Sequence, residues 1–278
     1  MGIRRDIRGA FALLTGVPIR VPAPVEGKSR HVAMWFPLVG IVLGAIPASA
    51  LFGLEKLNAR VSDGGFAQRG ALVAGVLVVA FWAWATRLLH WDGLGDVADA
   101  VWGGQTPQRR LEIMADPHVG GFGAAAIALI ALTQAASIGA IVAFGVGWKW
   151  VVLAAPASGR LSATFAAVLG KPAKQEGLGH SVAGSAGGPT TTAVMLALSV
   201  ATAVAAWVPM LLWAAGDTVL SGGVALHAAI ALGVLVCALA VPRLLARPFG
   251  GVTGDVMGAS VLLTETACLA VIALLGAW

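Results

Sequence analysis

Charged side chains are scarce in this sequence. Lys, Arg, Asp and Glu together account for 11% of its 278 residues, whereas an ordinary soluble domain carries about 25%. Hydrophobic residues make up 58% of the chain, and the mean hydropathy is +0.87. This composition excludes an ordinary soluble protein and predicts an integral membrane protein embedded in the lipid bilayer.

Cysteine is also nearly absent, and both copies, Cys237 and Cys268, lie within apolar runs. They therefore provide neither a disulfide framework nor a thiolate metal site. No cleaved signal peptide is expected, because the apolar stretch after Arg8, at residues 10–17, is short and lacks a small-residue cleavage site. Neither a linker nor a repeat of fixed period divides the chain, which predicts one domain over residues 1–278.

Seven apolar stretches have about the length of helix, roughly 20 residues, that crosses a bilayer. They predict an all-α, polytopic bundle of about seven transmembrane helices. The predicted spans are residues 34–54, 70–89, 121–146, 149–169, 191–215, 223–241 and 256–277. The basic, proline-broken segment before them predicts one short interfacial helix. The polar residues 90–120 predict two short helices that separate near Gly103, Gly104 and Pro107.

The basic residues predict the orientation of the bundle. With seven spans, 14 of the 18 Lys and Arg residues fall on the side of the N-terminus, and the other side keeps only Lys56, Arg60, Arg69 and Lys149. We therefore expect the N-terminus in the cytoplasm, the C-terminus outside, and an active site that faces the cytoplasm across the inner membrane. The same distribution accounts for the net charge of +5 without a nucleic-acid partner.

Five of the 13 carboxylates fall between Asp92 and Asp116. Asp92, Asp96 and Asp99 are spaced i, i+4 and i+7, so on a helix they lie within roughly 60° of one another. Like charges at this spacing repel one another unless a cation lies among them. Oxygen ligands without a Cys or His cluster favour Mg²⁺ or Mn²⁺, and such a metal at a membrane surface indicates chemistry on a phosphate-bearing substrate. The alternative is a solvated acidic helix face.

Asp116 and His118 flank a proline just before the third predicted span, and a glycine cluster that begins at Gly120 follows them. A helix N-terminus beside flexible glycines is a natural phosphate site, although such clusters are equally typical of helix packing in membranes. Asp116 is a candidate for a further metal ligand or for a base. His118 is equally compatible with an exposed loop.

Two charged residues fall inside predicted spans. A guanidinium in a bilayer is costly, so Arg160 should pair with a phosphate or an aspartate, unless it extends to the interface. Glu265 should face a partner or a polar cavity. Thr253 and Asp255, in an amide-rich turn before the last span, are candidates for contact with phosphate or metal. The basic loop at residues 170–190 has the charge to steer an anionic substrate.

A His-x-Asp-Gly-Leu-x-Asp-x-x-Asp pattern at residues 90–99 precedes a Thr-Gly-Asp triplet at residues 253–255. Together with four further stretches, these resemble the cobalamin synthase family, the adenosylcobinamide-GDP ribazoletransferases. The six matching stretches are residues 11–18, 90–99, 113–123, 156–160, 176–179 and 250–258. The sequence departs from the family where Ala100 follows Asp99, a position usually held by Gly, and in the loop at residues 103–110.

The resemblance implies a Mg²⁺-dependent phosphotransferase that joins adenosylcobinamide-GDP to α-ribazole, or to its 5′-phosphate, and releases GMP in the final assembly of the vitamin B12 nucleotide loop. The implied catalytic residues are Asp92, Asp96, Asp99, Asp116 and Arg160. The four aspartates are the implied Mg²⁺ ligands, and Asp116 is the first candidate for the base. The implied substrate contacts are His90, Gly93, His118, Gly120, Glu176, Thr253, Asp255 and Glu265. The preferred ribazole form and the state of assembly, including a homo-oligomer, stay open.

The sequence also has features of two other classes of membrane protein. A CDP-alcohol phosphatidyltransferase would use similar chemistry, but its pattern requires an aspartate where the chain has Leu89 and Ala-Arg where it has Asp96-Val97. A transporter would spread polar residues through the depth of the bilayer. The polar clusters here gather on one side, which favours an enzyme at the membrane surface.

Overall fold

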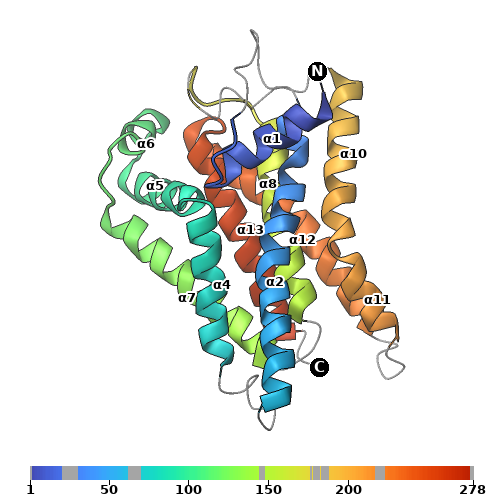
Figure 1. The fold of residues 1–278 in the computed structure, drawn as a ribbon. Helices are drawn as coiled ribbons and strands as arrows, with labels where there is room; N and C mark the ends of the chain where they lie inside the picture. The colour runs from blue at the N-terminus through green and yellow to red at the C-terminus, as the bar shows by residue number, and fades with distance from the viewer. Residues whose placement is uncertain are drawn as a thin grey trace.

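The computed structural model describes residues 2–20, 31–61, 70–143, 148–175, 177, 182, 188–216 and 223–275. This part of the chain is a bundle of helices (Figure 1) without a named strand; its one isolated bridge joins Pro172 and Val252. The elements are α1 (Ile3–Leu14), η1 (Val32–Trp35), α2 (Phe36–Val61), α4 (Ala71–Ala85), α5 (Leu89–Gly103), α6 (Pro107–Ile113), α7 (Gly121–Ala143), α8 (Trp148–Leu169), α10 (Pro189–Ala205), α11 (Val208–Gly216), α12 (Gly223–Ala246), η3 (Arg247–Phe249) and α13 (Gly254–Leu275).

The described residues contain five helices that are long and apolar enough to cross a membrane by themselves. They are Val32–Leu57, Gly121–Ala143, Trp150–Leu169, Ala228–Phe249 and Gly254–Leu275. A sixth span results if α4 and α5, which are bent by 91° relative to each other, count as one broken span. The predicted all-α membrane fold is therefore confirmed, while the count of seven spans stays a prediction.

The predicted span at residues 191–215 is divided in the structure. Helix α10 ends at Ala205, and α11 begins at Val208 after a turn at Ala206 and Trp207. Pro209 lacks an N–H, and in a continuous helix its ring would clash with the carbonyl of Ala205 four residues earlier, so the helix is interrupted here. Neither piece reaches the length of the five long spans.

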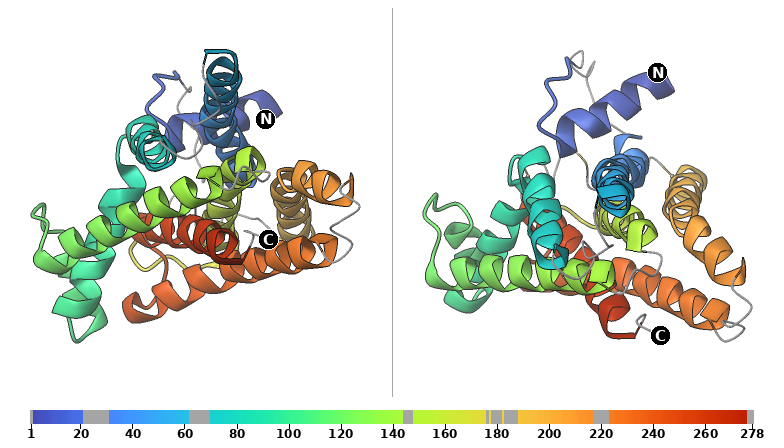
Figure 2. Two further views of the ribbon diagram at one scale, coloured as in Figure 1. Left: turned by 90° about the horizontal axis from the view of Figure 1, so that it is seen from below. Right: turned by 60° about the horizontal axis from the view of Figure 1, so that its bottom comes forward.

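Helix α8 forms the centre of the bundle, with α2, α10, α12 and α13 around it (Figure 2). Small residues allow this arrangement, because Ala, Gly and Ser occupy much of α8 and let neighbouring backbones approach closely. A Cβ atom on Gly44 of α2 would lie 2.5 Å from the Val152 carbonyl oxygen of α8. The close contact between α2 and α8 thus depends on glycine.

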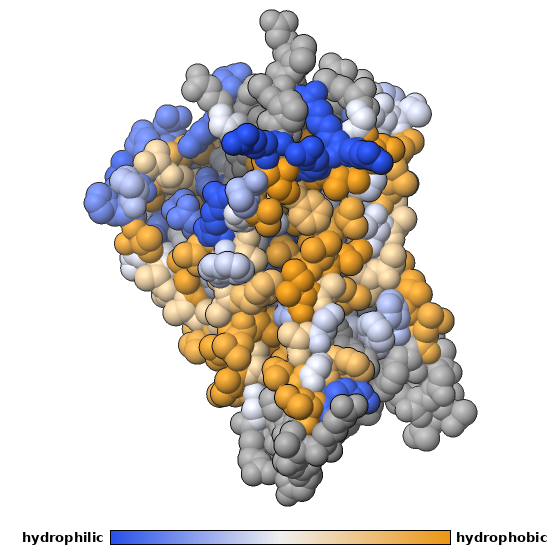
Figure 3. All heavy atoms as spheres, in the orientation of Figure 1, coloured by the Kyte–Doolittle hydropathy of each residue, from blue (hydrophilic) through white to orange (hydrophobic). Residues whose placement is uncertain are grey.

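Hydrophilic residues gather at one end of the molecule, above an apolar band (Figure 3). Helices α1, α5 and α6 lie at this end, which we call the polar end (Figure 1). Helix α1 confirms a short helix in the segment before the first span, and its interfacial position stays a prediction. Helices α5 and α6 confirm the two predicted short helices, and the break between them is fixed by Thr106, whose side chain accepts a hydrogen bond from the Arg109 N–H, and by Pro107.

Candidate active site

A sharp turn between α4 and α5 directs the acidic motif across the polar end instead of along the bundle. Arg87 and Leu88 both have positive φ angles, 51° and 61°, which non-glycine residues rarely adopt. The segment after α1 supports this turn: the Gly16 N–H donates to the Ala85 carbonyl at 2.7 Å, and Arg87 Nη2 donates to the Gly16 carbonyl at 3.0 Å. Strained backbone held by its surroundings is typical of functional sites.

Two glycines bring α5 against the start of α13. A Cβ atom on Gly93 would lie 2.9 Å from Cα of Asp255, and one on Gly258 would lie 3.3 Å from Cα of His90. The first distance is too short for any side chain without a backbone shift. This contact places Asp92 and Asp96, on α5, beside Asp255 in the first turn of α13.

We call Asp92, Asp96 and Asp255 the acidic cluster. Helix α5 lies across the polar end and outside the long spanning helices, and its Asp96 is half-buried. Burial raises the pKa of Asp96 to about 7, with further contributions from the negative charges of Asp92, Asp255 and Asp99, and the Lys174 charge opposes them. The cluster therefore holds more negative charge than its surroundings neutralise, which favours binding of a cation.

Asp99 has a different environment from the other carboxylates of α5. Its Oδ2 accepts a hydrogen bond from the Gly120 N–H at 2.7 Å, and its Oδ1 accepts one from the Gly123 N–H at 2.9 Å. A Cβ atom on Gly120 or Gly123 would overlap this carboxylate. Asp99 thus binds the N-terminus of α7, where backbone N–H groups favour negative charge, and joins α7 to α5.

Asp116 and His118 lie apart from the acidic cluster. Asp116 Oδ1 accepts hydrogen bonds from the His118 backbone N–H at 3.0 Å and lies 2.7 Å from its Nδ1, while 58% and 88% of the two side chains are exposed. These contacts, the backbone hydrogen bond first, lower the pKa of Asp116. Asp116 is not among the charges that shift the pKa of Asp96, whereas Asp255 is. The structure therefore brings Asp255, and not Asp116, to the aspartates of α5.

No group of three His, Cys, Asp or Glu side chains lies close enough to hold a metal ion within the described parts of the chain. The predicted set of Asp92, Asp96, Asp99 and Asp116 is accordingly not gathered around one point. The donor chemistry still fits Mg²⁺, which takes oxygen ligands and usually only one or two carboxylates, the rest being water and substrate phosphate. Its role at Asp92 and Asp96 stays a prediction.

Arg160 of α8 and Glu265 of α13 form an ion pair in the interior, with 1% and 2% of their side chains exposed. Gly159 leaves the space for this pair, since a Cβ atom there would meet the Glu265 side chain. The expectation that Glu265 faces a partner is confirmed. Arg160 has its carboxylate partner within the bundle, so its contact with a substrate phosphate stays a prediction.

Three of the predicted substrate contacts remain to be placed. His90 is buried at the start of α5, and neither ring nitrogen has a hydrogen-bond partner among the described residues. Thr253 caps α13, because its Oγ1 accepts a hydrogen bond from the Val256 N–H at 3.1 Å. Glu176 lies outside the described residues.

The loop after α8 contacts the segment before α13 through backbone hydrogen bonds that the sequence did not predict. Residues 171–173 pair with Val252, whose N–H donates to the Lys171 carbonyl at 2.7 Å and whose carbonyl accepts from the Ala173 N–H at 3.0 Å. This pairing brings the charge of Lys174 to bear on Asp96 and Asp255. No local pattern signals it, because the two segments are about 80 residues apart.

The family of this chain follows from comparison with known proteins. Residues 6–273 match the family described as cobalamin-5-phosphate synthase. The chain belongs to this family. Three curated relatives are each named adenosylcobinamide-GDP ribazoletransferase: one from Frankia casuarinae is 35% identical over 97% of this chain and 94% of its own. One from Chlorobium phaeobacteroides is 34% identical over 91% and 93%, and one from Rhizobium etli is 34% identical over 96% of both chains.

No solved structure matches the chain. As a member of the cobalamin-5-phosphate synthase family, the chain is a transferase of cobalamin biosynthesis with multiple apolar membrane helices. Among the three interpretations of the sequence, the family supports this one over a CDP-alcohol phosphatidyltransferase or a transporter. The motif at residues 90–99 supplies Asp92 and Asp96, two of the three residues of the acidic cluster.

Proposed function

We propose that the chain joins adenosylcobinamide-GDP to α-ribazole, or to α-ribazole 5′-phosphate, and releases GMP at the polar end of the bundle. The names of the relatives supply the reaction. The observation that supports this site for it is the convergence of Asp92 and Asp96 with Asp255 across the contact between α5 and α13. Because most Lys and Arg residues lie toward this end, we propose that it faces the cytoplasm from the inner membrane.

We propose that one or two carboxylates of the acidic cluster, Asp92, Asp96 and Asp255, hold Mg²⁺, with water and substrate phosphate as its other ligands. The bound ion would neutralise charge on the diphosphate of the substrate and on the departing phosphate. Asp99 would bind metal only by giving up its hydrogen bonds to the Gly120 and Gly123 amides. Asp116 lies apart, so the proposal replaces it with Asp255.

The proposed step exchanges one phosphorus–oxygen bond for another. A ribazole hydroxyl oxygen bonds to the phosphorus nearest the corrinoid, the bond from that phosphorus to the bridging oxygen breaks, and GMP leaves with this oxygen. The hydroxyl proton passes to a carboxylate of the acidic cluster. Asp116 is less suited to accept it, because the hydrogen bonds from His118 lower its pKa. Lys174 would attract the anionic substrate toward the cluster.

The test is an assay of GMP release by the detergent-purified chain with both substrates. We expect release to require ribazole and Mg²⁺, and Asp92→Asn and Asp96→Asn each to lower kcat by about 100-fold or more, as removal of transition-state charge stabilisation does. Glu112→Gln, which removes one exposed carboxylate of α6 at the same end, serves as the matched control and should retain activity.

Thermal unfolding of each variant separates loss of function from loss of fold. Full activity in Asp92→Asn or Asp96→Asn would contradict the assignment of the acidic cluster. A folded wild-type chain that releases no GMP from these substrates would contradict the proposed reaction itself.

A further inference from the structure

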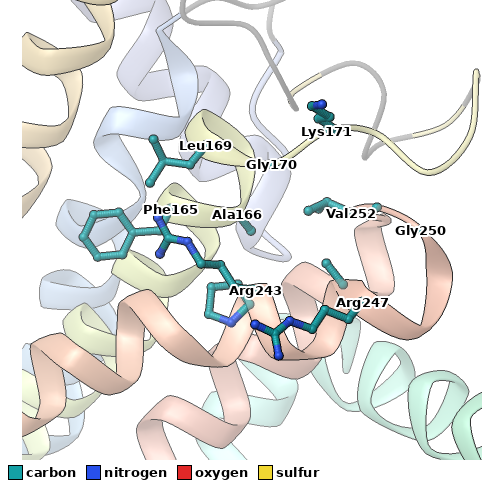
Figure 4. Close-up of a pocket in the computed structure, with 12 residues that line it drawn as sticks. Phe165, Ala166, Leu169, Gly170, Lys171, Arg243, Arg247, Gly250 and Val252 are labelled. Carbon is teal, nitrogen blue, oxygen red and sulfur yellow. The ribbon is translucent and has the colours of Figure 1, made fainter.

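A second charged pocket lies on the other side of the segment that leads into α13. It has a volume of about 360 Å³ and lies between the ends of α8 and α12. Figure 4 shows Arg243 near the end of α12, Arg247 at the start of η3, Lys171 on the loop after α8, and Phe165 and Leu169 on α8 itself. We call it the basic pocket. Val252 also lines it, three residues before Asp255 of the acidic cluster.

Within the part of the chain that the structure describes, the positive charge of the basic pocket is not balanced, because no Asp or Glu is among its described lining residues. The ion pairs among the described residues are Arg109–Glu112, His118–Asp116 and Arg160–Glu265, and none of them includes Lys171, Arg243 or Arg247. Arg243 Nη1 donates to the Leu239 carbonyl of its own helix at 2.6 Å. Two guanidinium groups and an ammonium beside an apolar wall favour a phosphate group that carries an apolar portion.

An apolar pocket of about 130 Å³ continues the same helix interface deeper into the bundle. Its lining includes Leu161 of α8, Leu235 and Ala238 of α12, and Trp207. Leu161 lies four residues before Phe165, so the two occupy the same face of α8 about 6 Å apart. Ala238 precedes Pro242, another residue of the basic pocket, by the same interval.

Leu161, Phe165, Ala203 and Ala238 pack together as one buried cluster, which lies between the two pockets. The only hydroxyl in the apolar pocket, that of Ser158, is already satisfied, since it donates to the Ala154 carbonyl and accepts from Trp207 Nε1. Helix α12 exposes most of its surface, so both pockets lie beside a helix that faces lipid. A polar anion site above an apolar groove matches the shape and chemistry of a phospholipid.

We propose that the two pockets bind one anionic phospholipid. Its phosphate contacts Arg243, Arg247 and Lys171, and an acyl chain runs along the exposed side of α12, from Leu239 over Leu235 into the apolar pocket. A zwitterionic lipid would offer the pocket no net negative charge, and a soluble phosphate ester would use only its upper part. The site is separate from the proposed reaction and does not depend on it.

Native mass spectrometry of the full chain, released from a delipidating detergent, tests this proposal. The chain is titrated with palmitoyl-oleoyl phosphatidylglycerol and, in parallel, with the phosphatidylcholine of the same acyl chains. We expect one phosphatidylglycerol to bind about tenfold or more tightly than phosphatidylcholine. Because a basic residue near the surface contributes about a fivefold preference for anionic lipid, Arg243→Gln with Arg247→Gln should weaken that binding roughly 30-fold.

The matched control is Arg4→Gln with Arg109→Gln, which also removes two positive charges, but from α1 and α6 at the same end of the molecule. This control should change the dissociation constant by less than about threefold. A third variant, Leu235→Trp, fills the apolar groove without changing charge and should also weaken binding of the lipid. It keeps the test decisive if the double arginine variant does not fold.

Three results would overturn the proposal: equal affinity for phosphatidylcholine, an equal loss of affinity in the control pair, or displacement of the lipid by glycerol phosphate at matching concentration. The last would identify a site for soluble phosphate esters instead. GMP release measured on the same preparation reports on the transferase reaction, so the failure of either proposal is distinguishable from that of the other.

Discussion

Helix α13 carries two carboxylates in opposite electrostatic environments. Asp255, in its first turn, lies with Asp92 and Asp96, and this group of like charges is opposed by Lys174. Glu265, ten residues or about 15 Å further along the helix, is fully buried and paired with Arg160. The acidic cluster therefore has surplus charge, whereas the interior pair is balanced within the bundle.

This difference separates two uses of charge in a chain that has little of it. In a balanced interior pair, the attraction between the two charges offsets the cost of removing them from water, and the pair joins two helices. An apolar pair of similar volume often stabilises the fold equally well. Surplus charge of one sign at a polar surface is instead stabilised from outside, by a metal or a substrate. Substitutions in the two regions should consequently have opposite effects on stability.

The largest effect is expected from breaking the interior pair. Glu265→Gln keeps the volume of the side chain but leaves the buried Arg160 charge without a partner, which should lower the free energy of unfolding by about 3–5 kcal/mol. Thermal unfolding in detergent measures this loss. The double variant Arg160→Met with Glu265→Met removes both charges and should recover most of the stability. Unchanged stability in Glu265→Gln would mean that the pair does not contribute to the fold.

A smaller effect of opposite sign is expected in the acidic cluster. Asp96→Asn removes one of three neighbouring carboxylates, so without Mg²⁺ it should raise the free energy of unfolding by up to about 1 kcal/mol. The same measurement in the presence of a chelator detects it. Asp6→Asn on α1 is the control for a change in net charge alone. A clear loss of stability in Asp96→Asn would show that the cluster is internally balanced after all.

The smallest effect is expected at Asp116, which the sequence suggested as a base. Its side chain is exposed, and its hydrogen bonds within the described residues go to its neighbour His118, so Asp116→Asn should change kcat/KM by less than about twofold, as surface substitutions usually do. The GMP-release assay decides this point. A loss comparable to that of Asp92→Asn would return Asp116 to the catalytic group and require a conformation in which it reaches the cluster.

Much of the architecture was predictable, because local sequence determines it. Long apolar stretches must form helices in a bilayer, where each backbone polar group needs a partner within its own segment. The two short helices after residue 90 and the short helix before residue 20 also followed from proline, glycine and polar residues. The division of residues 191–215 at Trp207 was missed, since a hydropathy window averages over the single proline that causes it.

The acidic motif was identified from spacing, but its partners were not. From the sequence, Asp99 and Asp116 were candidate metal ligands in the same way as Asp92. In the structure, Asp99 caps α7 and Asp116 is exposed. The pairing of Arg160 with Glu265 joins residues 105 positions apart, and neither position specifies the other. Residue type thus predicted the kind of chemistry available, but it did not predict which side chains lie together in the structure.

By itself, the sequence determined that this protein is helical, lies in a membrane and collects carboxylates at one end, because hydropathy and helical periodicity are local properties. The tertiary structure decided that Asp255 joins those carboxylates, that Asp116 does not, and that Arg160 is neutralised from α13. The physical reason is that these outcomes depend on how closely two backbones approach. Gly93 and Gly159 permit close contacts with Asp255 and Glu265, which lie more than 100 residues further along the chain.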